Sequence, residues 1–338
     1  MSGSKNKGKE RETDASSWIG FDLGGSKMLS IAYDDQLKPF GRRRRKTKSH
    51  GDANAGVRQI IDTIYEAMVD GKVRPEQLGG IGIGCPGPLD LNEGILFDAP
   101  NLGWKNLRLK DALQDEFGCP VVLVNDVDSG LYGEYRFGAG RKGRCVLGVF
   151  PGTGIGGGCV YEGKIIRGAR SSCMEIGHVQ VMPDGPLCGC GQRGCLEAVA
   201  SRLAIASAAA AAAYRGAAPH LLEDVGTDLT AIRSGALARS VEAGDAAVGA
   251  IVRAAAQMIG IAVAGVVHLL APDIVVLGGG LVEAMPELFV EEVERAARDR
   301  VLPSYAESFR VVAAELGDDA AVMGAASWAR EEIGRNRS

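Results

Sequence analysis

The stretch from Met174 to Glu197 holds one histidine and three cysteines at close spacing, with a glutamate on each side. His178, Cys188, Cys190 and Cys195 follow the pattern H-x9-C-x-C-x4-C, and the spacers between the cysteines are rich in glycine. Zinc prefers four nitrogen and sulfur ligands in a tetrahedron, and three cysteines with one histidine form a common structural set. The pattern predicts a structural zinc site whose positions are all filled by protein, so that the ion itself does no catalysis.

Two other interpretations of these cysteines are weaker. Cys188 and Cys190 are too close in sequence for easy bridging, and a redox pair more naturally shows C-x-x-C spacing. The polar N-terminal segment lacks the apolar core of a secretory signal, and the apolar stretch Met258–Pro272 is too short to span a bilayer. We therefore expect a reducing, cytoplasmic location and no membrane contact.

The two glutamates beside the cluster, Glu175 and Glu197, suggest a further role. A closed zinc site fixes its own backbone, so both carboxylates would be held rigidly beside it. His178 can bind the metal through one ring nitrogen and offer the other to a ligand. Paired acids around a fixed point suit hydrogen bonds to the vicinal hydroxyls of a sugar. The simpler alternative is that both glutamates are solvated surface residues.

Two glycine-rich segments look like copies of one unit, a strand, a turn and a second strand, about 130 residues apart. In the first copy Asp22 ends a strand and Gly24-Gly25 form the turn, while Thr153 lies in the turn of the second. Glycine N–H groups can approach phosphate oxygens, and a neighbouring carboxylate can hold Mg²⁺ through water. Each turn alone fits a plain hairpin in which glycine supplies positive φ, but the pair favours nucleotide binding.

Other nucleotide-binding patterns fit poorly. No stretch matches the P-loop, and Leu277–Gly280 follows a strand and opens a helix without the Rossmann glycine spacing. Strands that alternate with helices predict an α/β fold with a sheet in each half of the 338-residue chain. The segment Val127–Gly138 is expected to be helical, as is much of the alanine-rich region from Leu196 to Leu270. We place the boundary between the halves near Phe137–Gly143.

The assembled motifs resemble the ROK family of sugar kinases from Trp18 onward. The resemblance rests on the sequences DLGGSK, CPGPLD, APNLGW, ND, GTGIGGG, EIGH, CGCGQRGCLE and PDIVVLGGGL. It implies a two-lobed actin-like, ribonuclease-H-like ATPase fold with a mixed sheet in each lobe and a cleft between them. The implied division is a disordered tail at 1–16, a smaller lobe at 17–137 completed by a C-terminal helix at 321–338, and a larger lobe at 138–320 with the zinc site and dimerisation helices.

The resemblance also implies roles for individual residues. Asp126 matches the catalytic base, which takes the proton from the 6-hydroxyl of the sugar as that oxygen attacks the γ-phosphorus of ATP. Asp22 would position Mg²⁺. The family's sugar ligands match Asn101, Glu175, His178 and Glu197. The residues that match its nucleotide motifs are Gly24, Gly25, Ser26 and Lys27 in the first turn, Gly152, Thr153 and Gly154 in the second, and Gly278 and Gly279 in the adenosine motif.

Glucose is the expected substrate, because the short spacer between His178 and Cys188 resembles that of glucokinases and N-acetylmannosamine kinases of the family. N-Acetylmannosamine, N-acetylglucosamine, fructose and allose stay alternatives, and a polyphosphate donor is less expected. A sugar-responsive repressor is a further alternative, but only 21 residues precede Asp22 and they show no helix-turn-helix pattern. The net charge of -4 and the reading of Arg42–Lys46 as a solvated strand edge also argue against nucleic acid as a partner.

Three positions depart from the family pattern. Cys173-Met174 replace small residues, Val127-Asp128 stand where Ala-Asn is usual, and Arg202 stands where glycine is common. Asp128 adds a negative charge that could raise the pKa of Asp126. The resemblance and the alanine-rich helices also imply a homodimer packed through the second lobe.

Overall fold

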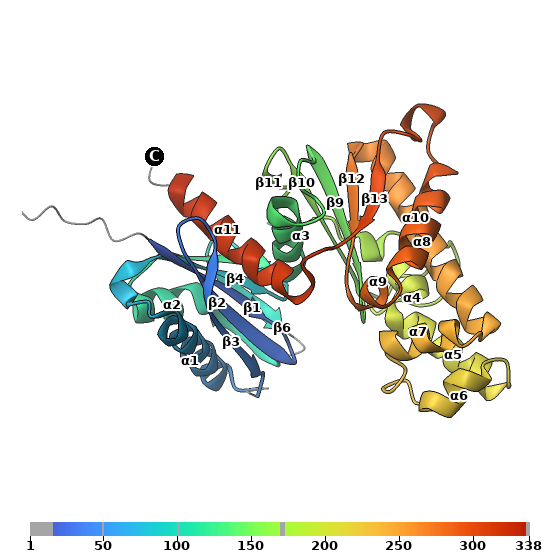
Figure 1. Cartoon of the computed structure of the whole chain (residues 1–338), viewed down its shortest axis with the longest axis horizontal. Coiled ribbons are helices and arrows are strands. Elements are labelled where there is room, and N and C mark those ends of the chain that lie inside the picture. The colour runs from blue at the N-terminus through green and yellow to red at the C-terminus, as the bar shows by residue number, and fades with distance from the viewer. Residues whose placement is uncertain (1–15, 49–50, 100–101, 170–172, 336–338) are drawn as a thin grey trace, which may run out of the picture.

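The computed structural model describes residues 16–48, 51–99, 102–169 and 173–335 of the chain. Two five-stranded sheets lie side by side, and helices α3 (Asp126–Phe137) and α11 (Ala320–Arg335) lie between them (Figure 1). The expected α/β fold with one sheet in each half is therefore confirmed. Of the predicted N-terminal tail, all but Ser16 falls outside the described residues, as do the last three positions of the predicted C-terminal helix.

The first sheet is mixed, with strand order β3-β2-β1-β4-β8. Its strands are β1 (Ser17–Leu23), β2 (Lys27–Tyr33), β3 (Pro39–Lys46), β4 (Leu78–Cys85) and β8 (Val121–Asn125). β1, β2 and β3 pair antiparallel, whereas β4 and β8 run parallel to β1. Helix α1 (Ala53–Gly71) packs on β2 and β3, while α11 packs on β1 and β4. A small sheet of β5 (Leu89–Asp90), β6 (Ile95–Ala99) and β7 (Trp104–Arg108), with η1 (Pro75–Gln77) and α2 (Leu109–Phe117), completes this half.

The second sheet has the order β11-β10-β9-β12-β13. Its strands are β9 (Cys145–Pro151), β10 (Ile155–Tyr161), β11 (Lys164–Ile165), β12 (Ile274–Leu277) and β13 (Arg310–Ala313). The remaining elements are η2 (Ile176–His178), α4 (Leu196–Ala200), α5 (Arg202–Tyr214), α6 (Pro219–Val225), α7 (Ser234–Glu242), α8 (Ala246–Leu270), α9 (Gly280–Ala284), α10 (Pro286–Arg298), η3 (Pro303–Tyr305) and η4 (Gly317–Asp319).

Strand β12 shows how this sheet is buried on both faces. Ile274 and Val276 join a core cluster with α3 and α11, while Val275 and Leu277 join a larger cluster with α8 and α10. Successive side chains of a strand point to opposite faces, so a central strand that is apolar throughout serves two cores. The strand ends next to the glycine motifs are therefore held by packing on both faces of the sheet.

The two predicted hairpins are confirmed as β1–β2 and β9–β10. The predicted reason for their glycines is wrong, because Gly24, Gly152 and Gly154 all have φ outside the left-handed region. Close approach is the better explanation at two of them. A Cβ on Gly24 would lie 2.7 Å from the carbonyl oxygen of Lys27, and one on Gly154 would lie 2.3 Å from a carboxylate oxygen of Glu197.

The chain crosses from the first sheet to the second through residues 138–144 and returns through 314–319. Glu134, buried in α3, holds both crossings with one carboxylate. It accepts hydrogen bonds from the backbone N–H groups of Ala139 at 2.9 Å and Leu316 at 2.7 Å. The core cluster with α3 and α11 draws on strands of both sheets, so the two halves share buried contacts. The division into lobes at these crossings stays a prediction.

Helix α8 corrects the argument about membrane spans. The segments Leu196–Tyr214 and Ala246–Leu270 are both long and apolar enough to cross a bilayer by length and composition. The sequence estimate failed because α8 begins twelve residues before Met258 and reaches 25 residues. Packing accounts for its apolar character, since more than half of its most apolar part is buried and the helix contacts α10, α4 and α5. The apolar faces of both segments belong to the core.

Candidate active site and zinc centre

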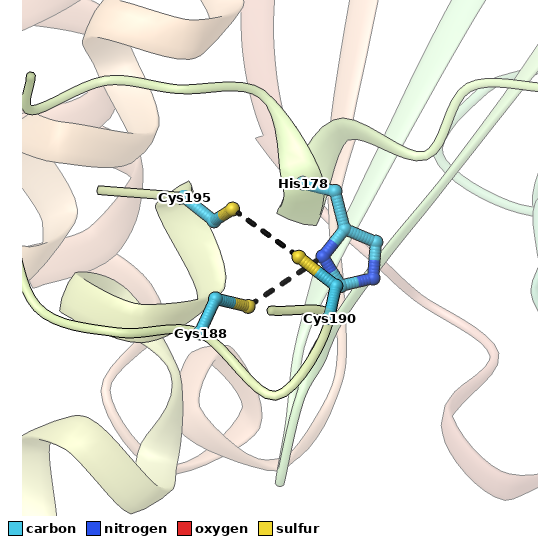
Figure 2. A group of neighbouring side chains, drawn as sticks. All are labelled: His178, Cys188, Cys190 and Cys195. Carbon is cyan, nitrogen blue, oxygen red and sulfur yellow. Dashed lines mark hydrogen bonds between the residues drawn. The ribbon is translucent and has the colours of Figure 1, made fainter. Parts of the chain in front are cut away.

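The predicted zinc ligands come together in one cluster (Figure 2). His178 lies at the end of η2, Cys188 and Cys190 lie in the following loop, and Cys195 immediately precedes α4. Their ligand atoms all lie within 4.8 Å of one another, with Cys188 Sγ 3.7 Å from His178 Nδ1 and Cys190 Sγ 3.6 Å from Cys195 Sγ. Zn–S bonds of about 2.3 Å place two tetrahedral sulfur ligands roughly 3.8 Å apart, so the geometry fits one zinc ion.

Backbone hydrogen bonds shape the loop that carries these ligands. Cys188 N–H donates to the carbonyl of Gln192, and Gly194 N–H donates to Pro186. Gly191 and Gly194 have φ of 88° and 72°, a region that favours glycine, and a Cβ on Gly194 would lie 1.7 Å from the carbonyl oxygen of Met182. Gly191 and Gly194 are therefore needed for the fold of this loop, whereas Gly189 has open space around its Cα.

Glu197 joins the cluster to the second glycine turn. Its Oε1 lies 3.9 Å from Cys188 Sγ, while its Oε2 accepts a hydrogen bond of 3.0 Å from the backbone N–H of Ile155. Ile155 is buried, and its N–H has the Glu197 carboxylate as partner. The simple reading of Glu197 as a solvated surface residue is therefore wrong, and its carboxylate braces the turn at Gly154.

Arg202 braces the same turn from the start of α5. Its Nη2 donates to Thr153 Oγ1 at 2.7 Å, and its backbone N–H donates to the carbonyl of Gly152 at 2.9 Å. The turn itself is closed by a 2.8 Å hydrogen bond from Gly152 N–H to the carbonyl of Gly154. The predicted phosphate-binding turn, residues 152–154, is thus held by Arg202 directly and by Glu197 through the adjoining Ile155.

The adenosine motif adjoins this second turn. Gly278 N–H donates to the carbonyl of Val149, and Gly279 precedes α9 with φ of 81°. A Cβ on Gly279 would lie 2.9 Å from the carbonyl oxygen of Pro151. Glycine is required at Gly279 by both its conformation and its close approach to β9.

Asp126 begins α3 at the end of β8, where the Asn125 side chain caps the helix by accepting from the N–H groups of Val127 and Asp128. Burial raises the pKa of Asp126 to about 6, and the nearby charge of Glu175 adds to the shift. Burial also raises the pKa of Asp22 to about 6, with the charge of Asp126 as the next cause. Both carboxyls can therefore exchange protons near neutral pH.

Asp22 and Asp126 line one cavity of about 240 Å³ together with Gly279 and Asp318. This cavity lies where the ends of β1, β8 and β12 approach the start of α11. A larger cavity of about 640 Å³ beside the crossing segment at 138–142 contains none of the predicted site residues. The predicted base, the predicted magnesium-positioning acid and the adenosine motif thus share one cavity.

The first turn contacts η4, the short helix before α11, through residues that the sequence did not single out. Asp318, in η4, forms ion pairs with both Lys27 and Arg44. Thr47 Oγ1 donates to the carbonyl of Gly24 at 2.7 Å, and Gly24 N–H donates to that of Lys27. The run of arginines along β3 is the only signal for Arg44, which shares a face of the edge strand with Arg42 because successive side chains point to opposite faces.

Further predictions concern the arginine run of β3 and Asn101. β3 is an edge strand whose Arg43 and Arg45 pair with Glu66, so the solvated-edge interpretation of 42–46 is confirmed. Asn101 lies outside the described residues. The roles assigned to the sugar, nucleotide and metal ligands stay predictions.

Comparison with known proteins bears on the chain as a whole. The family model described as the ROK family matches residues 18–332. A glucokinase from Thermotoga maritima is 36% identical over 326 residues, which cover 94% of this chain and 98% of that protein. A xylose repressor from Caldicellulosiruptor bescii is 27% identical, with coverage of 92% of this chain and 77% of that protein.

A solved structure gives the same picture in three dimensions. The crystal structure of a ROK family glucokinase from Streptomyces griseus, in complex with glucose and AMPPNP, matches with a TM-score of 0.78 and 30% identity. The match covers 94% of this chain and all of that one, and it confirms the expected actin-like ATPase fold. By sequence and by fold, this chain belongs to the ROK family of proteins.

Proposed function

We propose that this chain is an ATP-dependent hexokinase that phosphorylates the 6-hydroxyl of glucose. The observation that carries the proposal is the cavity in which Asp22 and Asp126, both half-buried and both with raised pKa, lie beside Gly279. A half-buried carboxylate with a pKa of about 6 is ionised at neutral pH yet basic enough to accept a proton from a hydroxyl as it attacks. The relatives named glucokinase support glucose as the acceptor.

In this mechanism Asp126 takes the proton of the sugar hydroxyl, while Asn101, Glu175, His178 and Glu197 bind the other hydroxyls. His178 directs Nδ1 toward the cysteine cluster, which leaves Nε2 as the nitrogen for the sugar (Figure 2). The two turns, Gly24–Lys27 and Gly152–Gly154, bind the phosphates of ATP, and Gly278-Gly279 lie against the adenosine. Mg²⁺, when bound near Asp22, supplies positive charge to the phosphoryl group during transfer.

Zinc has a structural part in this proposal. The cluster fills all four tetrahedral positions with protein, so its role is to hold Glu175 and Glu197 in place. A cytoplasmic location, a homodimeric assembly, and the absence of membrane and nucleic-acid partners belong to the same proposal, because they accompany a glycolytic sugar kinase.

The test is ATP-dependent phosphorylation of a hexose panel that contains glucose, N-acetylmannosamine, N-acetylglucosamine, fructose and allose. We expect turnover on glucose, and Asp126→Asn should lower kcat by about 10²–10⁴-fold because the general base is lost. Asp115→Asn, which removes a carboxylate from the exposed surface of α2, is the matched control and should leave kcat unchanged. Turnover on another hexose alone would refute glucose as the substrate while keeping Asp126 as the base.

A sugar-responsive regulator is the second candidate, because the chain also matches a xylose repressor. The two functions differ in one readout. A regulator binds its sugar with similar affinity in the wild type and in Asp126→Asn, and no hexose is phosphorylated by either. Sugar binding without turnover across the whole panel would therefore replace the kinase proposal with the regulator.

A further inference from the structure

We propose that Arg202 binds the phosphoryl groups of the nucleotide as a cationic ligand; the inference rests on the proposed kinase function. Arg202 forms two hydrogen bonds with the second turn, one from its backbone N–H to Gly152 and one from its guanidinium to Thr153. The guanidinium is therefore held on the turn that the kinase mechanism assigns to phosphate.

The position of the turn relative to the cavity supports this assignment. Phe150, two residues before the turn, lines the cavity that contains Asp126. On the other side of the turn, a Cβ on Gly156 would lie 2.6 Å from a methyl carbon of Val127, the neighbour of Asp126 in α3. The strands on the two sides of the turn therefore contact the cavity that holds the proposed base and the start of α3, and Gly279 approaches Pro151 at the end of β9.

The charge of Arg202 is uncompensated within the described part of the chain. Lys27 and Arg44, the cations near the first turn, are both paired with Asp318. Among the described residues, no carboxylate forms an ion pair with Arg202, and its side chain donates to a neutral hydroxyl. Glu197, the acid at this turn, directs Oε2 to the N–H of Ile155 instead. A guanidinium that is fixed on the turn and has no counter-ion in the described part of the chain favours an anionic ligand.

The donor geometry matches a phosphoryl group. A guanidinium has five N–H donors in a planar fork, so the bond to Thr153 leaves donors for the oxygens of a phosphate. Because Arg202 donates to Thr153 Oγ1, the hydroxyl hydrogen of Thr153 is free to donate to the same ligand. In phosphoryl transfer the charge is spread over the oxygens of the transferred group, where an arginine stabilises it directly.

The competing explanation is that Arg202 only braces the turn. Bracing would affect every ligand that depends on the turn, whereas phosphate binding affects only ligands that carry phosphates. Arg202→Ala and Arg202→Lys separate the two, with Arg215→Ala as the matched control because it removes an exposed arginine from the other end of α5.

The experiment measures the binding of a non-hydrolysable ATP analogue and of adenosine by calorimetry, together with steady-state kinetics on ATP and glucose. In Arg202→Ala we expect affinity for the ATP analogue to fall about tenfold and the KM for ATP to rise by a similar factor, as one charge-assisted contact is lost. Affinity for adenosine, the KM for glucose and every property of Arg215→Ala should stay unchanged. Added guanidinium ion, and the lysine variant, should each restore part of the ATP affinity.

Equal losses for the ATP analogue and adenosine would overturn the proposal in favour of a brace, and an unchanged affinity for the ATP analogue would overturn it outright. The kinase function fails in a different way, by the absence of turnover in the wild type. In that case the binding comparison still tests Arg202, because it needs no catalysis.

Discussion

The two glycine turns share a backbone plan but obtain their charged groups differently. In the first, Asp22 belongs to the strand that enters the turn and Lys27 to the strand that leaves it. In the second, the adjoining strands carry no charged residue near the turn, and Glu197 and Arg202 reach it from α4 and α5. The charged groups of the first turn therefore lie in its own two strands, whereas those of the second turn reach it through tertiary contacts.

This difference makes the second turn dependent on the zinc cluster. Glu197 follows Cys195 by two residues, so a metal bound at the proposed zinc site would fix the start of α4 and with it the carboxylate that holds Ile155. The first turn is held instead by Asp318 and Thr47, which lie far from the cluster in sequence. Perturbations of the metal should therefore reach one turn and spare the other.

The largest expected effect comes from removing a metal ligand. Cys195→Ser should abolish stoichiometric zinc, destabilise the fold by about 3 kcal/mol or more, and lower kcat/KM by about 100-fold, because Glu197 loses its fixed support. Elemental analysis, thermal unfolding and steady-state kinetics measure the three effects. Cys119→Ala removes a buried thiol from the first half and should keep one zinc per chain. Full activity in a zinc-free wild type would contradict the dependence of the second turn on the metal.

The contrast between the turns also explains what sequence reasoning could reach. The four zinc ligands lie within eighteen positions, so their spacing alone carried the prediction, and the hairpins and α3 followed from local pattern. The bond between Arg202 and Thr153 joins residues 49 positions apart, and the ion pair between Lys27 and Asp318 joins residues 291 apart. Neither has a local signal, because chain folding alone brings these partners together.

The errors of sequence reasoning have similar causes. Positive φ was the expected reason for the turn glycines, but Gly154 is required by the approach of Glu197, which only the tertiary structure supplies. The membrane argument failed because it counted only the apolar stretch from Met258 onward, whereas α8 begins at Ala246. Local sequence indicates that a glycine or an apolar run matters, whereas the surrounding elements decide why.

A smaller effect sharpens the contrast between the two acids beside the cluster. Glu197→Ala should raise both the KM for glucose and the KM for ATP, each by roughly tenfold, since it leaves the buried N–H of Ile155 unpaired as well as a sugar hydroxyl. Glu197→Gln keeps an acceptor for that N–H and should raise mainly the KM for glucose. Glu175→Ala should also affect glucose alone. An ATP effect of equal size in Glu175→Ala and Glu197→Ala would remove the special link between Glu197 and the second turn.

The smallest expected effect concerns Asp128, a buried acid that lies beside the second hairpin and not the first. Burial and the charge of Asp126 raise the pKa of Asp22 beside the first hairpin, whereas Asp128 lies against the second, where a Cβ on Gly158 would be 2.9 Å from its Oδ1. Burial raises the pKa of Asp128 from 3.8 to about 7, while the charge of Arg167 opposes the shift and those of Asp126 and Glu175 add to it. The folded protein therefore binds this proton more tightly than the unfolded chain.

The sign of the pH dependence follows from that preference. The stabilising contribution of the protonated Asp128 carboxyl is complete below about pH 3.8 and is lost as the pH rises through about 7, where a buried charge must form in the folded state. Asp128→Asn cannot ionise, so its free energy of unfolding should exceed that of the wild type by on the order of 1 kcal/mol at pH 8 and by much less at pH 4.5. Denaturant unfolding of both proteins at both pH values measures this difference. A stability difference that does not change with pH would mean that Asp128 is paired in the folded state, and the second hairpin would then neutralise its acid as the first neutralises Asp318.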